Sequence, residues 1–228
     1  MLTYRYPLIA REGWLWIATA ILFALLGYVL EQWVSVPLWL LVLGLLYLFR
    51  DPVRKIPAAP LAIVSPVDGK VVSVGLVHDA FLDRQALCIS IKMGLTSVYS
   101  IHSPMEGKVM QQWLGVPEKI ADESSARQQK PTCYAQWLQS DEGDDTLVVI
   151  HTQPLRSRPR CYAQSGERIG QGQRCGFIRF GAQVDILVPE KSRLEVSVGD
   201  TVLAGSDIIA TLVHARATAP KAAEAEND

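Results

Sequence analysis

The sequence has few of the groups that bind nucleic acid or metal ions. Its 22 Lys and Arg residues nearly balance 23 Asp and Glu, which leaves a formal net charge of −1. There is no basic stripe interleaved with aromatic residues, so we expect no nucleic-acid partner. Only four cysteines and four histidines occur. No C-x-x-C pair and no zinc-ligand spacing is present, so we expect free thiols in a reducing compartment and no metal site.

Charged residues are nearly absent from two runs near the N-terminus. Residues 14–30 are apolar except for Thr19, and residues 33–49 are apolar except for Ser35. A 17-residue helix is about 26 Å long, slightly short of a hydrocarbon core of about 30 Å. The two-residue connector, Glu31 and Gln32, predicts a tight hairpin with helices at about 13–30 and 34–49. We assign residues 1–55 to this membrane hairpin.

The charges flanking the two runs predict their orientation. Arg5 and Arg11 precede the first run, and Arg50, Arg54 and Lys55 follow the second, whereas the connector has no cation. The positive-inside rule then places both ends in the cytoplasm. We therefore expect the inner (cytoplasmic) membrane, with the soluble domain on its cytoplasmic side. A monotopic hairpin in one leaflet, or a buried hairpin in a soluble core, is the alternative.

Helical periodicity is weak beyond residue 61, where short Val- and Ile-rich runs alternate with Gly, Pro, Asp and Ser. This pattern predicts a mainly β domain over residues 56–214. The expected strands cover residues 62–64, 70–74, 86–91, 107–113, 146–152, 177–180, 184–188, 194–196 and 208–213. Residues 122–130 are expected to form a surface loop, and residues 215–228 a disordered tail.

Two phrases in the β domain are related to each other. Residues 65–71 read SPVDGKV, and residues 103–109 read SPMEGKV. A third phrase, VSVGDTVLAG at 196–205, resembles the half-motif of lipoyl and biotinyl domains, which are flattened barrels called barrel-sandwich hybrids. A carrier role is not expected, because no lysine occupies the hairpin tip.

Together these phrases resemble the phosphatidylserine decarboxylase family of the short bacterial and archaeal type. The resemblance also includes FRDP at 49–52 and GERIGQGQRCGFIRFGAQVDILVP at 166–189. It implies a mainly β decarboxylase fold with a barrel-sandwich-hybrid element and an N-terminal transmembrane hairpin. The implied activity is that of a carboxy-lyase, which converts phosphatidylserine to phosphatidylethanolamine.

The resemblance also implies a covalent pyruvoyl cofactor, which family members form from their own chain. This chain lacks the serine from which that group is made. In the family, a Ser after the glycine matching Gly181 attacks that glycine's carbonyl, and the cut chain then begins with a covalent pyruvoyl group. Here the position is Ala182, whose methyl group is neither a nucleophile nor a leaving group. We therefore expect no cofactor, no self-cleavage and no activity.

Three further positions match family site residues. Asp68 matches an Asp that assists self-cleavage, although an Asp-Gly turn would also explain it. His102 matches a second His seen in part of the family, and a structural histidine in a strand is the alternative. Ser97 and Tyr99 stand where the family has Asp and His. Three departures at three functional positions favour natural drift over a single engineered change.

Three cations, Lys92, Arg174 and Arg179, are expected to contact lipid phosphate or carboxylate, with ordinary strand-face charge as the alternative. The leading hypothesis is a membrane-bound pseudoenzyme that binds phospholipid, as a homo-oligomer or beside an active relative. The first alternative is an active decarboxylase with a changed serine or unconventional processing. The second is a membrane-anchored β-barrel adaptor without a lipid role.

Overall fold

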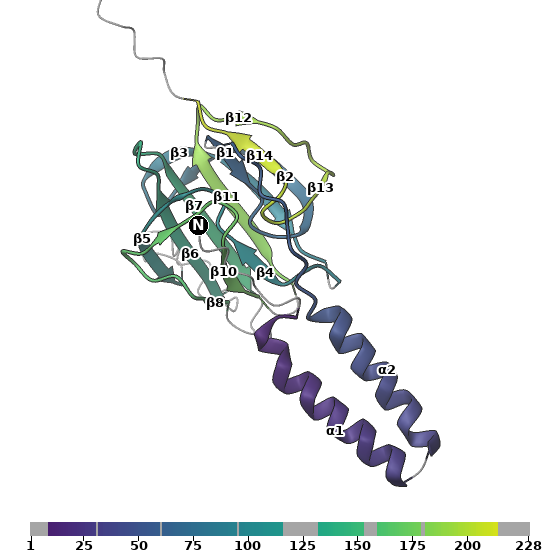
Figure 1. Ribbon diagram of the computed structural model, residues 1–228. Helices are drawn as coiled ribbons and strands as arrows, with labels where there is room; N and C mark the ends of the chain where they lie inside the picture. Colours follow the sequence, from purple (N-terminus) through teal and green to yellow (C-terminus); the bar gives the residue numbers. More distant parts are fainter. Residues whose placement is uncertain are drawn as a thin grey trace, which may run out of the picture.

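The computed structural model describes residues 9–30, 32–59, 61–94, 96–115, 132–152, 159–178 and 181–213. A 3₁₀ turn, Arg11–Gly13, leads into α1 (Trp14–Leu30), and α2 follows at Gln32–Leu48. The two helices lie side by side and project from one end of the β domain (Figure 1). The two helices begin and end within two residues of the expected bounds, and their insertion in a membrane stays a prediction. The segment Arg11–Leu30 is long and apolar enough to cross a membrane, whereas the apolar part of α2, Ser35–Leu48, is shorter.

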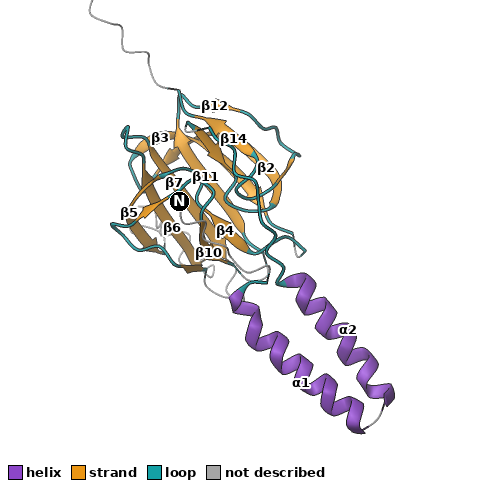
Figure 2. Ribbon diagram, in the orientation of Figure 1, coloured by secondary structure: helices purple, strands orange, loops and turns teal. Residues whose placement is uncertain are grey.

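Antiparallel strands form the rest of the described structure (Figure 2). They are β1 (Ala62–Val64), β2 (Gly69–Asp79), β3 (Arg84–Lys92), β4 (Ser100–His102), β5 (Gly107–Leu114), β6 (Thr132–Gln139), β7 (Asp145–Thr152), β8 (Arg160–Cys161), β9 (Arg168–Ile169), β10 (Arg174–Phe177), β11 (Gln183–Pro189), β12 (Arg193–Leu194), β13 (Thr201–Val202) and β14 (Ile208–Thr211). A curled sheet has the order β13-β2-β3-β11-β7-β6-β5-β9. Two smaller sheets have the orders β1-β14-β12 and β4-β10-β8.

Alternation along the central strands separates a core face from an outer face. Val71, Ile91, Val184 and Ile150 occupy one register row and are buried in the main hydrophobic cluster. The neighbouring row on the opposite face contains Lys70, Lys92, Gln183 and His151, all exposed or half-buried. Period-2 burial of this kind is what a sheet with one packed face requires.

The two related phrases adopt the same structure around an approximate two-fold relation. The hydroxyl of Ser65 donates to the Val67 carbonyl, and that of Ser103 donates to the Met105 carbonyl. The halves also bond to each other: Val64 N–H donates to the Pro104 carbonyl, and His102 N–H donates to the Pro66 carbonyl. The phrase pair recognised in the sequence is therefore a structural repeat.

Each half of this repeat is completed by a second phrase with Gly at both ends. Residues 199–205 (GDTVLAG) bring β13 to β2, and residues 166–172 (GERIGQG) bring β9 to β5. Gly205 and Gly172 both have left-handed φ angles, +67° and +66°, and donate to the carbonyls of Ser65 and Ser103. The arrangement of these four sequence motifs, together with the curled sheet, is consistent with a half-barrel. The barrel-sandwich-hybrid name remains a prediction.

Most predicted strands are present: β2, β3, β5, β7 and β11 are longer than expected, β1 has the expected bounds, and β12 and β14 are shorter. Of the expected strand at 177–180, only Phe177 lies in a described strand, at the end of β10, and residues 179–180 lie outside the described residues. Six described strands were not predicted: the short strands β4, β8, β9, β10 and β13, and the eight-residue strand β6. The expected loop at 122–130 and tail at 215–228 lie outside the described residues.

Candidate functional site

The repeat contains two equivalent acids in different environments. Glu106 is on the surface, where it forms an exposed ion pair with Arg168. Asp68 is buried at 8% exposure; its Oδ2 is 2.6 Å from the Arg54 guanidinium, and its Oδ1 accepts from Ala204 N–H at 2.7 Å. Burying a charge is costly unless it is paired. An Asp in a simple Asp-Gly turn can remain exposed, so a turn alone does not explain why Asp68 is buried and paired with Arg54.

His102 is at the repeat position that Val64 occupies in the other half, and its ring lies near Gly205, next to the Ala204 N–H that Asp68 binds. A Cβ built on Gly205, the residue after Ala204, would lie 3.4 Å from the His102 ring. Within the described part of the chain, the buried Nδ1 of His102 has no hydrogen-bond partner. Burial, followed by the nearby cations Arg174 and Arg54, lowers the pKa of His102 to about 4. The imidazole is therefore neutral at pH 7.

The structure places Gly181 and Ala182 at the start of β11. Ala182 is 8% exposed, and its carbonyl accepts from Met93 N–H at 3.0 Å. Gly181 has φ of +74°, a left-handed conformation that favours glycine. The side chain at the expected cut position is thus a nearly buried methyl group. The residues present do not fit the formation of a pyruvoyl group, because the hydroxyl oxygen that would attack the Gly181 carbonyl, and then leave with the new C-terminal carboxylate, is missing.

Ser97 and Tyr99 have local structural partners. The Ser97 hydroxyl accepts from Gly94 N–H at 3.0 Å within a turn. Tyr99 is 2% exposed, and its ring packs edge-on against Phe177, with centroids 6.2 Å apart. The structure thus gives both residues roles in packing and turn formation. Their catalytic assignment stays a prediction.

The three expected lipid-binding cations occupy different settings. Lys92 is exposed on the outer face at the end of β3. Arg174, on β10, has a side chain only 4% exposed and is bound by two carboxylates. Arg179 lies outside the described residues. The structure does not bring Lys92 and Arg174 into one site, and their lipid contacts stay predictions.

Arg174 instead joins the β domain to both ends of the hairpin. Its guanidinium is 3.0 Å from Glu12, just before α1, and 3.0 Å from Asp51, just after α2. Asp51 also accepts from the Ser100 hydroxyl at 3.0 Å. Burial raises the pKa of Asp51, and the Arg174 charge opposes that rise. We call Glu12, Asp51 and Arg174 the junction triad.

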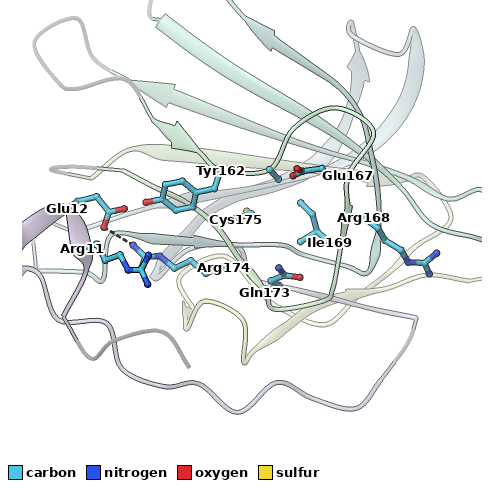
Figure 3. A pocket seen from close by; sticks show the side chains of 10 residues that line it. Arg11, Glu12, Tyr162, Glu167, Arg168, Ile169, Gln173, Arg174 and Cys175 are labelled. Carbon is cyan, nitrogen blue, oxygen red and sulfur yellow. Dashed lines mark hydrogen bonds and ion pairs between the residues drawn. The ribbon is translucent and has the colours of Figure 1, made fainter. Parts of the chain in front are cut away.

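A cavity of about 420 Å³ opens beside the junction triad. Figure 3 shows Arg11, Glu12, Tyr162 and Arg174 at one end and Glu167, Ile169 and Arg168 toward the other. The Arg174 guanidinium lies 5.8 Å from the Tyr162 ring centroid. Side chains of both charge signs line the cavity, so the charge of the lining does not by itself favour an anionic ligand.

Sequence reasoning missed several residues of this region. Arg54 was interpreted only as a topology signal, but it is the ion-pair partner of Asp68. Glu12 and Asp51 were not selected, although each is an acid directly flanking an apolar run. Their position was the available signal, because an acid that becomes buried where an apolar helix meets the rest of the fold needs a cation partner.

The fold and site define a mainly β protein with an apolar helical hairpin, in which buried Asp68 and His102 both lie near the linker residue Arg54. Comparison with known proteins identifies the family. The family described as phosphatidylserine decarboxylase matches residues 44–210, and this chain belongs to it. Its role lies in phospholipid metabolism.

Three relatives, each named phosphatidylserine decarboxylase proenzyme, match nearly the whole chain. The Nitrosomonas eutropha protein is 38% identical over 209 residues, which cover 91% of this chain and 96% of that protein. The Aromatoleum aromaticum protein is 37% identical over 214 residues, covering 92% and 98%. The Burkholderia pseudomallei protein is 39% identical over 215 residues, covering 92% and 98%.

We expect protonation of His102 to destabilise the protein as the pH falls from about 6.5 to about 4. The folded-state pKa is about 4, below the ordinary value of 6.5. The unfolded chain therefore binds more protons in this window, and stability increases as the pH rises through it. The shift corresponds to about 3 kcal/mol.

Urea unfolding of the full-length chain in detergent, at pH 4.5 and 7.5, tests this expectation. His102→Gln should show a smaller loss of stability at pH 4.5 than the unsubstituted protein. Asp51 titrates in both proteins and cancels from the comparison. Equal pH dependence in the two proteins would show that His102 is not the group responsible.

Proposed function

We propose that this chain is a membrane-anchored pseudoenzyme of the phosphatidylserine decarboxylase family. It stays uncut, forms no pyruvoyl group and acts by binding phospholipid or a protein partner. Ala182 is the observation that carries the proposal. A methyl group at the expected cut position supplies no oxygen to attack the Gly181 carbonyl, and no pKa change in its surroundings replaces that atom.

The proposed anchor is the helical hairpin inserted from the cytoplasmic side. Many large apolar side chains on both helices are exposed, including Leu15, Phe23, Val29 and Leu40. Exposed apolar surface on this scale is stable in lipid and unfavourable in water. Cations flank both ends of the hairpin at its base, which supports a cytoplasmic location of the β domain. A homo-oligomer, or a pair with an active relative, is the proposed assembly.

A direct assay separates this proposal from catalysis. Purified full-length protein is incubated with vesicles that contain phosphatidylserine, and phosphatidylethanolamine is measured by mass spectrometry. We expect no product above the protein-free control. Product formation at catalytic turnover would establish the first alternative, an active decarboxylase with unconventional processing. If there is no product and no retention of any particular phospholipid headgroup, the adaptor alternative is favoured.

Restoring the hydroxyl with Ala182→Ser is expected to leave the chain uncut. The reason is that Ser97 and Tyr99 also depart from the family pattern, and the structure commits both to local packing. Chain cleavage is read by denaturing mass spectrometry, with the unsubstituted protein as the control. Two fragments together with phosphatidylethanolamine formation would refute the drift argument and indicate an active enzyme with a changed serine.

A further inference from the structure

Acids and cations are segregated at the base of the hairpin. The acids of the junction triad face inward, with Glu12 and Asp51 side chains 12% and 6% exposed and both bound to Arg174. Asp68 is likewise buried and bound to Arg54. These carboxylates therefore add little negative charge to the surface that surrounds the helices.

Four cations belong to the same region, and we call them the basal collar: Arg11, Lys55 and Arg160, which are exposed, and Arg50, which is half-buried. Arg11 is exposed in the turn that leads into α1. Arg50, two residues after α2, pairs with Ile9 in an isolated β-bridge, and its guanidinium is partly buried. Lys55 is exposed in the linker that follows. Arg160 is exposed on β8 opposite Phe177, whose ring stacks on Phe49 at the end of α2.

Side chains suited to a membrane interface accompany the basal collar. The Arg50 guanidinium lies 4.0 Å from the centroid of the half-exposed Tyr47 ring. Trp14 is 56% exposed at the start of α1, and Val53 is 81% exposed in the linker. Aromatic rings and cations at the end of an apolar helix are typical of the headgroup level.

We propose that the basal collar is an interaction surface for anionic phospholipid in the leaflet that the hairpin enters. The proposal rests on the membrane anchoring proposed above and specifies the lipid class. Inward-facing acids and outward-facing cations leave a net positive ring where the β domain meets the lipid surface. Such a ring attracts anionic headgroups over a distance of about 8–10 Å at physiological salt.

Lipid retention by the full-length chain tests this inference. The protein is inserted into nanodiscs of phosphatidylcholine and phosphatidylglycerol at equal amounts, and the lipids that remain bound after mild detergent extraction are quantified. The collar variant carries Lys55→Gln and Arg160→Gln. The matched control carries Lys191→Gln and Arg193→Gln, which remove two cations near β12, away from the helices (Figure 1).

The unsubstituted protein and the control are expected to retain phosphatidylglycerol in excess, and the excess should fall at high salt. One cation near a membrane surface favours anionic lipid by about fivefold, so the collar variant should return most of the way to the bulk ratio. Equal retention by the collar variant and the control, or no excess in any protein, overturns the proposal. Failure to enter nanodiscs overturns the anchor itself, whereas self-cleavage would appear separately in the protein mass.

Discussion

Arg174→Gln is expected to destabilise the protein by about 3–5 kcal/mol, because it leaves Glu12 and Asp51 buried without their shared cation. Removing one partner of a buried ion pair is costly, since the remaining charge is neither solvated nor compensated. The penalty should shrink at acidic pH, where Asp51 takes up a proton. Urea unfolding of the full-length chain in detergent, followed by circular dichroism of the β-sheet, measures the loss.

Arg168→Gln is the matched control for this experiment. Arg168 also binds two carboxylates, Glu106 and Asp141, but all three side chains are more than half exposed. Exposed ion pairs contribute little to stability, because water and salt screen both charges. If Arg168→Gln costs as much as Arg174→Gln, burial is not the cause. Adding Glu12→Gln and Asp51→Asn to Arg174→Gln should recover much of the loss.

Gly107→Ala is expected to cost about 3 kcal/mol or more. A Cβ at this position would lie 2.4 Å from the carbonyl oxygen of Gln139 on the paired strand β6. Backbone atoms of a paired strand cannot move away as a flexible side chain does, so the two strands must separate. The same reason applies to Gly69 in the other half of the repeat, where the Lys92 carbonyl oxygen would be 2.5 Å away.

Gly75→Ala provides the control for the glycine prediction. Gly75 is in β2, has no heavy atom within 4 Å of a built Cβ, and lies outside the left-handed region. Its substitution should change the free energy of unfolding by less than about 0.5 kcal/mol. Similar losses for Gly75→Ala and Gly107→Ala in urea unfolding would show that strand propensity, and not steric contact, determines the effect.

The sequence predicted those parts of the fold that depend on local pattern. Two long apolar runs predicted the hairpin, and Val- and Ile-rich runs predicted strands such as β1 and β11. Strands β8, β9 and β13 have only two residues each, so they carry too little periodicity to detect. The match between residues 166–172 and 199–205 was the missed signal, because both have Gly at each end and an acid after the first Gly.

The candidate site was predictable only where a motif marked it. Asp68 and His102 were found from their sequence motifs, and the structure places both along one segment: Asp68 accepts from Ala204 N–H, and the His102 ring lies near Gly205. Their surroundings depend on long-range pairing: Arg54 reaches Asp68 from the linker, and Arg174 reaches Glu12 across a sequence separation of 162 residues. Ion pairs between residues so far apart in the sequence produce no periodic pattern from which they could be predicted.

Intact-mass spectrometry of the purified full-length protein, together with a carbonyl-reactive probe, tests the central claim most directly. The claim is that Ala182 prevents self-cleavage in a chain that belongs to the phosphatidylserine decarboxylase family. We predict a single unreactive chain near 25.2 kDa. Two fragments, the smaller of which carries a reactive carbonyl, would contradict the account, and their masses would locate the cut.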